Sequence, residues 1–345
     1  MKKMKTELFI LLVLALGAVS CGKMETAGNA GEGKTCVGGA VSFESSLPED
    51  ALTRASVSYL DSLKSDGFLV WANVREDGDA QDEKFMNSQS VTWDADSGQW
   101  TYSPVKLWPT GESATLDFYA VYLDGTDNVS TTWDWYNRPR TTFRVPDTVS
   151  EQSDLLWAAP LLDVDAQDYA RNDRAINFTF RHALSGFRFS CRLAAEPDTG
   201  TTVTVDSVSL TGYFAATAVV LPQKTVLSEA LSLQGDWVER TYTISKDRDD
   251  EVNTAVSSGD GLTTSPQLVS GDKGIIMVLP FAHEYTLTLN YTVTNAGSTT
   301  GHYVSSRTVT DPELVSGKML DIEMVLTPTE VPVSSLEFVS RSTEL

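Results

Sequence analysis

The sequence predicts an all-β protein built from β-sandwiches, and three observations lead to that prediction. Short segments rich in β-branched and aromatic residues recur along the chain, and several alternate apolar with polar residues. No long stretch shows sustained helical periodicity. The roughly 300 residues beyond the amino-terminal leader are long for a single core, so we expect two sandwich domains in tandem.

The expected strands follow one another through the body of the chain. In order they are 67–74, the hairpin 90–104 around Asp96-Ser97-Gly98, 114–123, 140–147, 176–193, 201–213, 273–281, 285–294 and 318–328. One helical turn is expected within 56–64, with Ser56 as its cap. The acidic stretch 161–175 lacks strand character. It is therefore the expected break between an N-terminal domain (36–174) and a C-terminal domain (175–326).

The first twenty residues form an expected signal peptide. A basic start at Lys2, Lys3 and Lys5 precedes an apolar run that is too short to span a bilayer comfortably. The run ends in small residues just before Cys21, which resembles the lipobox of bacterial lipoproteins. Cys21 is thus the expected lipidation site, where several acyl chains would hold the protein at the outer membrane; a plain secretory signal is the alternative. Residues 21–35 are polar and Gly-rich, which is typical of a flexible tether.

Composition excludes several classes of function. The formal net charge of -21 argues against binding to nucleic acid or to anionic lipid. Three scattered histidines and the two remaining cysteines, Cys36 and Cys191, do not build a zinc site, and their spacing gives no support for a disulfide. The acidic segments 163–173 and 246–251 lack the residue order of a calcium loop. No nucleophile or metalloenzyme motif occurs, so we expect neither an enzyme nor a cofactor.

Aromatic residues raise one alternative function. Five of the eight tryptophans fall between residues 93 and 135, and exposed aromatic rings stack on sugars in glycan-binding lipoproteins. Trp93, Trp100 and Trp108 lie at strand or turn positions, where packing is the commoner role. The segment 131–140 ("TTWDWYNRPR") is the stretch most expected to be exposed. Trp133 and Trp135 are therefore the candidate contacts for a glycan or protein receptor.

Several short stretches, in order, resemble the fimbrillin family of Bacteroidales, the FimA and Mfa-like fimbrial subunits. They are the lipobox at Cys21, "TRA" (53–55), "GFLVWANV" (67–74), the segment 91–122 in which "LWP" leads into "LDFYA", "DLLWA" (154–158), "INFTFRHALSGFRF" (176–189) and "GKMLDIEMVL" (317–326). The resemblance implies two transthyretin-like β-sandwich domains in tandem. It also implies a fimbrial subunit at the cell surface that supports adhesion and polymerises with other fimbrial subunits.

The resemblance implies an assembly mechanism with specific residues. A protease would cut between Arg54 and Ala55 and release the first strand, 36–46, with Val41 and Phe43 facing inward. A donor segment, 327–345, from a neighbouring subunit would fill the open groove by main-chain pairing. Its inward residues would be Val331, Val333, Leu336 and Phe338. A head-to-tail contact of this kind generates a fibre.

Alternatives remain open at this point. Arg54 can be an ordinary solvated surface residue, and 327–345 can be a polar tail or an edge strand of its own chain. The competing functions are a monomeric surface lipoprotein that binds glycans through Trp133 and Trp135, and a calcium-dependent adhesin. The residues do not rank stalk, anchor and tip roles, and they do not name a host receptor or the processing protease.

Overall fold

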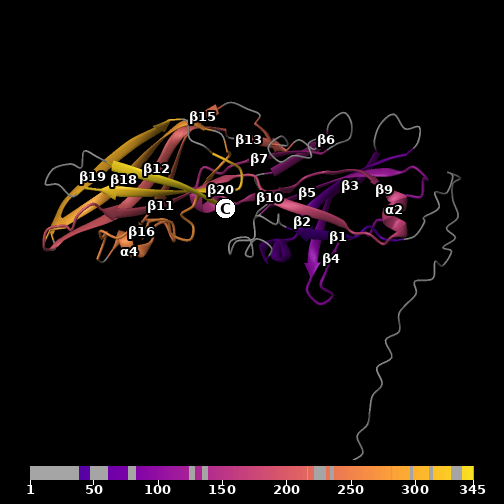
Figure 1. The fold of residues 1–345 in the computed structure, drawn as a ribbon, viewed down its shortest axis with the longest axis horizontal. Helices are drawn as coiled ribbons and strands as arrows, with labels where there is room; N and C mark the ends of the chain where they lie inside the picture. The colour runs from indigo at the N-terminus through magenta and orange to yellow at the C-terminus, as the bar shows by residue number, and fades with distance from the viewer. Residues whose placement is uncertain are drawn as a thin grey trace, which may run out of the picture. The chain divides into compact units, whose positions relative to one another are not determined.

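The computed structural model describes most of the chain and is all-β, as the sequence predicts (Figure 1). The described residues are 39–46, 61–76, 83–123, 129–133, 139–215, 217–220, 231–233, 237–258, 260–280, 282–295, 298–310, 314–327 and 336–344. Helical segments in these ranges are short. They are residues 61–66, η2 (Val149–Glu151), α2 (Ala166–Arg171) and α4 (Thr254–Ser257). Residues 36–345 form one compact unit.

The first half of the chain forms an eight-stranded sheet. Its order is β1-β10-β8-β5-β2-β3-β4, and β9 also pairs with β5. The strands are β1 (Phe43–Ser46), β2 (Phe68–Arg75), β3 (Glu83–Asp94), β4 (Gln99–Thr101), β5 (Thr115–Leu123), β8 (Leu155–Ala158), β9 (Leu161–Asp165) and β10 (Ile176–His182). All pairs are antiparallel except β1 with β10. The predicted hairpin of 90–104 is confirmed as β3–β4, with Gly98 at a φ of 66° in its turn.

Three further sheets complete the described fold. A five-stranded sheet contains β16 (Gln267–Leu268), β11 (Ser185–Leu193), β20 (Lys318–Leu326), β21 (Leu336–Glu344) and, beside β11, β17 (Ile276–Val278). A four-stranded sheet contains β15 (Trp237–Ser245), β12 (Thr201–Ala215), β18 (Ala282–Asn295) and β19 (Ser298–Thr310). A second four-stranded sheet contains β14 (Leu231–Leu233), β13 (Thr217–Val220), β7 (Pro139–Arg144) and β6 (Val129–Trp133).

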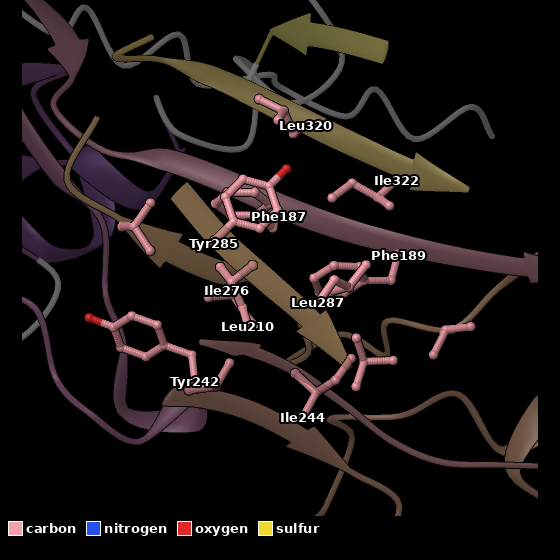
Figure 2. Packing of buried hydrophobic residues seen from close by; sticks show 14 of the residues in the cluster. Phe187, Phe189, Leu210, Tyr242, Ile244, Ile276, Tyr285, Leu287, Leu320 and Ile322 are labelled. Atoms are coloured by element: carbon pink, nitrogen blue, oxygen red, sulfur yellow. The ribbon is translucent and has the colours of Figure 1, made fainter. Parts of the chain in front are cut away.

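The second half of the chain buries a sandwich core between two of these sheets. Side chains of β11, β17 and β20 lie toward those of β12, β15 and β18, as Figure 2 shows. The rings of Phe187 and Tyr285 meet edge to face, with centroids 5.2 Å apart. The strict alternation predicted for 285–294 is confirmed, because Leu287, Leu289 and Tyr291 are all buried.

The outer face of the β12–β18 sheet carries hydroxyl groups. Thr211 and Thr241 share a hydrogen bond of 2.9 Å, as do Ser209 and Thr243. Thr286 of β18 and Thr308 of β19 form a similar hydrogen bond on the same face, toward the other edge of the sheet. This face therefore carries hydroxyl groups that are hydrogen-bonded across the strands, together with the carboxylate of Asp206, to which Thr292 Oγ1 donates at 2.6 Å. Such a polar surface is expected for the solvated side of an antiparallel sheet.

The central strands β2, β5 and β8 of the eight-stranded sheet are buried on both faces. Along β5, Phe118 and Tyr122 belong to one hydrophobic cluster, whereas Tyr119 and Val121 belong to the other. The first cluster also contains Leu63 of the helical segment 61–66, Trp108 and residues of α2. The second cluster continues into the sandwich core of the second half. Strand β5 thus alternates between two cores, which explains its nearly unbroken apolar sequence.

The acidic stretch 161–175 differs from its prediction as a loop without strand character. It contains β9 and α2. Asp165 caps the helix, because its side chain accepts hydrogen bonds from the backbone N–H groups of Gln167 and Asp168. Asp163 takes a φ of 54° and its N–H donates to Asp117 Oδ1 at 2.8 Å. The carboxylates therefore serve local capping and turn geometry and do not mark a linker.

The chain changes sheet later than the predicted domain boundary. The alternation of segment 176–193 predicts one face with Ile176, Phe178 and Phe180 and another with Phe187, Phe189 and Cys191. The segment forms β10 and β11, which lie in different sheets. The change occurs at Ala183 and Leu184, both fully buried. A division after residue 174 therefore separates β10 from β8, its antiparallel partner in the first-half sheet.

Replacement of Leu287 by alanine tests the sandwich core. The side chain is fully buried, so Leu287→Ala should lower the free energy of unfolding by about 2–5 kcal/mol through lost burial and a residual cavity. The neighbouring Thr286→Ala, on the hydroxyl face, should change it by less than about 0.5 kcal/mol. Urea unfolding of both variants measures the difference, and equal effects would contradict the assignment of faces.

Candidate functional site

The segment Gly39–Ser46 occupies a slot at one edge of the eight-stranded sheet. Strand β1 pairs with β10 in parallel, from Phe43 opposite Ile176 to Ser46 opposite Thr179. The N–H of Ile176 donates to Ser42 O at 2.8 Å. The segment before β1 has a second neighbour on its other side, since Val41 N donates to Lys106 O at 2.9 Å. The backbone of this short segment is therefore hydrogen-bonded to two separate parts of the chain.

Alternate side chains of the segment point into the core. Val41 and Phe43 are 1% and 4% exposed, whereas Ser42 and Glu44 are exposed. The Phe43 ring stacks on Phe178 at 5.8 Å between centroids and lies 5.2 Å from Tyr102. It also meets Phe68 and Phe118 edge to face. An edge strand of this kind contributes a large apolar anchor from only two inward residues.

Tyr102 closes the slot from the side of the β3–β4 hairpin. Its hydroxyl donates to Val41 O at 2.7 Å and accepts from Lys106 N at 3.2 Å. Burial raises the pKa of this hydroxyl above its usual value, so it stays a donor at neutral pH. Sequence reasoning did not assign this residue or the segment 104–108 to the slot. The available signal was the pair of prolines, Pro104 and Pro109, around the buried Trp108.

The chain's last described strand lies at the edge of another sheet. Strand β21 pairs antiparallel with β20 from Leu336 opposite Leu326 to Glu344 opposite Lys318. Phe338 takes the register position opposite Met324. Leu326 and Met324 are both buried, so Leu336 and Phe338 of β21 share register positions with a buried row. The segment 327–345 thus contains an edge strand of its own chain, which was one of the sequence-based alternatives.

Comparison with known proteins identifies the family of this chain. The sequence matches the fimbrillin-like family over residues 53–337. The chain belongs to the fimbrillin-like family. Among curated protein sequences, none matches this chain.

A fimbrial protein from Bacteroides vulgatus has the same fold at low sequence identity. It is similar with a TM-score of 0.62 and 16% identity, over 88% of this chain and 99% of that chain. A protein of Bacteroides uniformis assigned provisionally to cell adhesion has a TM-score of 0.44 and 14% identity, over 88% and 98% of the two chains. The family match supports a fimbrial, cell-surface role without enzymatic activity.

Several predicted site residues of this fimbrillin-like chain lie outside the described residues. They are Cys21, Arg54, Ala55, Val331, Val333 and Trp135. Trp133 is the last residue of β6, opposite Pro139, and its side chain also lies outside the described part. Trp100 and Trp108 are buried at 8% and 2% exposure, so both pack in the core as expected. No observation within the described residues therefore favours a tryptophan platform.

Histidine and the acidic loops serve local structure. His182 Nδ1 bonds to Asp154 Oδ2, and both side chains are nearly buried. Glu251, which is fully buried, accepts a hydrogen bond from Ser245 N at 3.0 Å and holds the 246–251 loop in place. Within the described ranges, no group of three or more His, Cys, Asp or Glu side chains could hold a metal ion. The described part also contains no helix that is long and apolar enough to cross a bilayer.

Truncation of Phe43 tests the anchor in the slot. Phe43→Ala removes a buried ring with four aromatic neighbours, so it should lower the free energy of unfolding by about 3–5 kcal/mol in the uncut chain. Glu44→Ala alters an exposed side chain of the same strand and should have little effect. Denaturant unfolding compares the two variants; an unchanged midpoint for Phe43→Ala would refute the anchor role.

Cys191 should be chemically inert in the folded protein. It is a free thiol, fully buried on β11, and burial raises its pKa to about 12. Because the thiolate is the reactive form, a Cys21→Ser, Cys36→Ser chain should not react with a thiol reagent at pH 8 until it unfolds. Mass spectrometry of the labelled protein measures this, and rapid native labelling is the outcome that would contradict it.

Proposed function

We propose that this protein is a structural subunit of a fimbria that supports adhesion. It is exported as a lipoprotein acylated at Cys21, cut after Arg54 and polymerised by strand exchange between copies or with other fimbrial subunits. Family membership supports the fimbrial role. The observation that carries the assembly step is the edge position of Gly39–Ser46, with Val41 and Phe43 as its buried anchors.

A cut after Arg54 would have two consequences at once. Arg54 follows β1 in the sequence and precedes β2, so the cut would leave β1 attached to the body by non-covalent contacts alone. The same cut would separate the body from the lipid on Cys21. Departure of β1 would leave unpaired backbone groups on β10 and a bare pocket formed by Phe68, Tyr102, Phe118 and Phe178. Such a groove is costly in water and binds an extended segment.

The carboxyl-terminal segment of a second copy has a sequence that suits this groove. The segment in the slot reads Val-Ser-Phe-Glu-Ser from Val41, and β21 reads Leu-Glu-Phe-Val-Ser from Leu336. Each places an aliphatic residue two positions before a phenylalanine, which is the spacing of one face of a strand. We therefore assign Phe338 to the pocket of Phe43 and Leu336 to the position of Val41. Val331 and Val333 supply an earlier alternating run.

Exchange requires β21 to leave its own chain. Strand β21 is an edge strand, so only its pairs with β20 must break. Pro328 and Pro332 lie between the two strands and disfavour continued pairing there. The donor assignment therefore involves competition between β20 of the same chain and β10 of a neighbour. In two transthyretin-like β-sandwich domains in tandem, the groove and the donor strand would belong to different sheets of one subunit.

Limited proteolysis tests the proposal. The mature chain carrying Cys21→Ser should be cut once after Arg54 by a trypsin-like protease and then form concentration-dependent ladders that resist denaturant on gels. Arg54→Gln should prevent the cut. Phe338→Asp should allow the cut and abolish the ladder, because a carboxylate in the aromatic pocket would be buried without a partner. Electrophoresis and intact-mass measurement follow both steps.

Glu337→Gln is the matched control, since it alters the neighbouring residue of β21 and should leave the ladder intact. A chain that is cut after Arg54 and stays monomeric at high concentration would overturn the exchange step. Recovery of surface protein whose first residue is not Ala55 would overturn the processing site. Incorporation of labelled palmitate that persists in a Cys21→Ser chain would overturn the lipidation site.

A further inference from the structure

One long hairpin in the second half of the chain contributes strands to two different sheets. Strands β12 and β15 pair from Ser207 opposite Ser245 to Ala215 opposite Trp237. Beyond them along the same two chain segments, β13 and β14 pair from Ala218 opposite Leu233 to Val220 opposite Leu231. The hairpin, Thr201–Ser245, therefore has its base in the sheet with β18 and β19 and its distal part in a different sheet.

The distal part of this hairpin completes a sheet begun by the first half. Strand β13 pairs antiparallel with β7, from Thr217 opposite Arg144 to Val220 opposite Thr141, and lies beside it in Figure 1. Strand β6 follows on the other side of β7. The sheet β14-β13-β7-β6, which we call the shared sheet, therefore takes two strands from each half of the chain.

A continuous core lies beneath the shared sheet. Phe143 of β7 is 1% exposed, and Val145 follows it fully buried. Both belong to the hydrophobic cluster that includes Phe214 and Tyr242 from the base of the hairpin. Tyr242 is visible at the margin of that core in Figure 2. The same cluster contains Trp71 and Trp157 from the eight-stranded sheet, so apolar contacts run without interruption between the halves.

Polar contacts tie the same region together. Arg240 of β15 forms an ion pair with Asp147, which follows β7, and the Arg240 side chain is only 10% exposed. Asp147 Oδ2 also lies 3.5 Å from Arg144 Nη2. Nearby, Met277 N of β17 donates to the side-chain oxygen of Gln152 at 2.8 Å, and the Gln152 amide donates to Pro146 O. The segment after β7 is thus bonded to two strands of the second half.

We propose that the hairpin Thr201–Ser245 is a latch that makes the two halves open and unfold as one unit. Domains in tandem move independently when their interface is small and polar. Here, separation requires simultaneous loss of the β7–β13 ladder, the Arg240–Asp147 ion pair and the apolar contacts of Phe143. The Arg240 side chain is nearly buried, whereas that of Asp147 is 64% exposed. Loss of Asp147 on opening would leave the Arg240 guanidinium without its carboxylate partner in a largely buried position, which is unfavourable.

Unfolding of the mature Cys21→Ser chain tests the latch directly. Urea transitions should coincide for tryptophan fluorescence, which reports mainly on the first half, and for hydrogen exchange of β18 peptides in the second half. In a shortened variant, Asn-Gly replaces residues 216–236, so that Ala215 joins Trp237 through a tight turn. This variant lacks the distal part of the hairpin. Its unfolding should split into two transitions, with faster exchange in β7 and little change in β18.

A milder variant keeps the test decisive if the shortened chain does not fold. Asp147→Asn removes the partner of Arg240 and should raise hydrogen exchange of β7 and β13 peptides together, several-fold. The matched control is Asp168→Asn, which removes the exposed pair with Arg174 on α2 and should leave both peptides unchanged. Separate transitions in the unmodified chain, or a rise confined to one of the two strands, would overturn the latch.

Discussion

Burial of both faces of the central strands β2, β5 and β8 is the constraint on which the rest of the structure depends. An antiparallel sheet usually leaves one face to water, yet β5 sends Phe118 into one core and Tyr119 into the other. Each face needs its own cover. Residues 61–66, α2 and the segment around Trp108 cover one face, and the core that continues into the second half covers the other.

At the edge of that sheet, strand β1 is held strongly by its side chains but by few backbone hydrogen bonds. Strand β1 is only four residues long and pairs with a single full strand, β10. Its hold on the protein depends on Phe43, whose ring sits among four aromatic neighbours. A short strand with one large anchor can be replaced by another strand of similar spacing, whereas a long central strand cannot. This is why we place assembly at this edge and not at β5 or β2.

Local patterns predicted most of the strands, because alternation and turn chemistry act over a few residues. The hairpin β3–β4 and the alternation of β18 are readable from neighbouring residues, whereas the inward positions of Val41 and Phe43 came from the family resemblance. The change of face between Phe180 and Phe187 is also readable, but the change of sheet at Ala183 and Leu184 is not, because it depends on partner strands far away in sequence. Helix α2 was not predicted, because the acidic residues around its N-cap, Asp165, read as a loop. The slot wall at Lys106 and the pairing of β13 with β7 join residues far apart in sequence, and no local pattern specifies such partners.

The shared sheet also decides what a fragment of this protein would be. A piece ending at the crossover of Ala183 and Leu184 would contain the whole eight-stranded sheet, but β7 would lose β13 and Phe143 would lose its cover. The complementary piece would present a hairpin with no strand to receive it. Each piece would keep a core of its own but would lose its share of the cluster that spans both halves. Gene dissection at the point where the chain changes sheet would therefore yield two incomplete proteins, and a recombinant half would be a poor surrogate for the native surface.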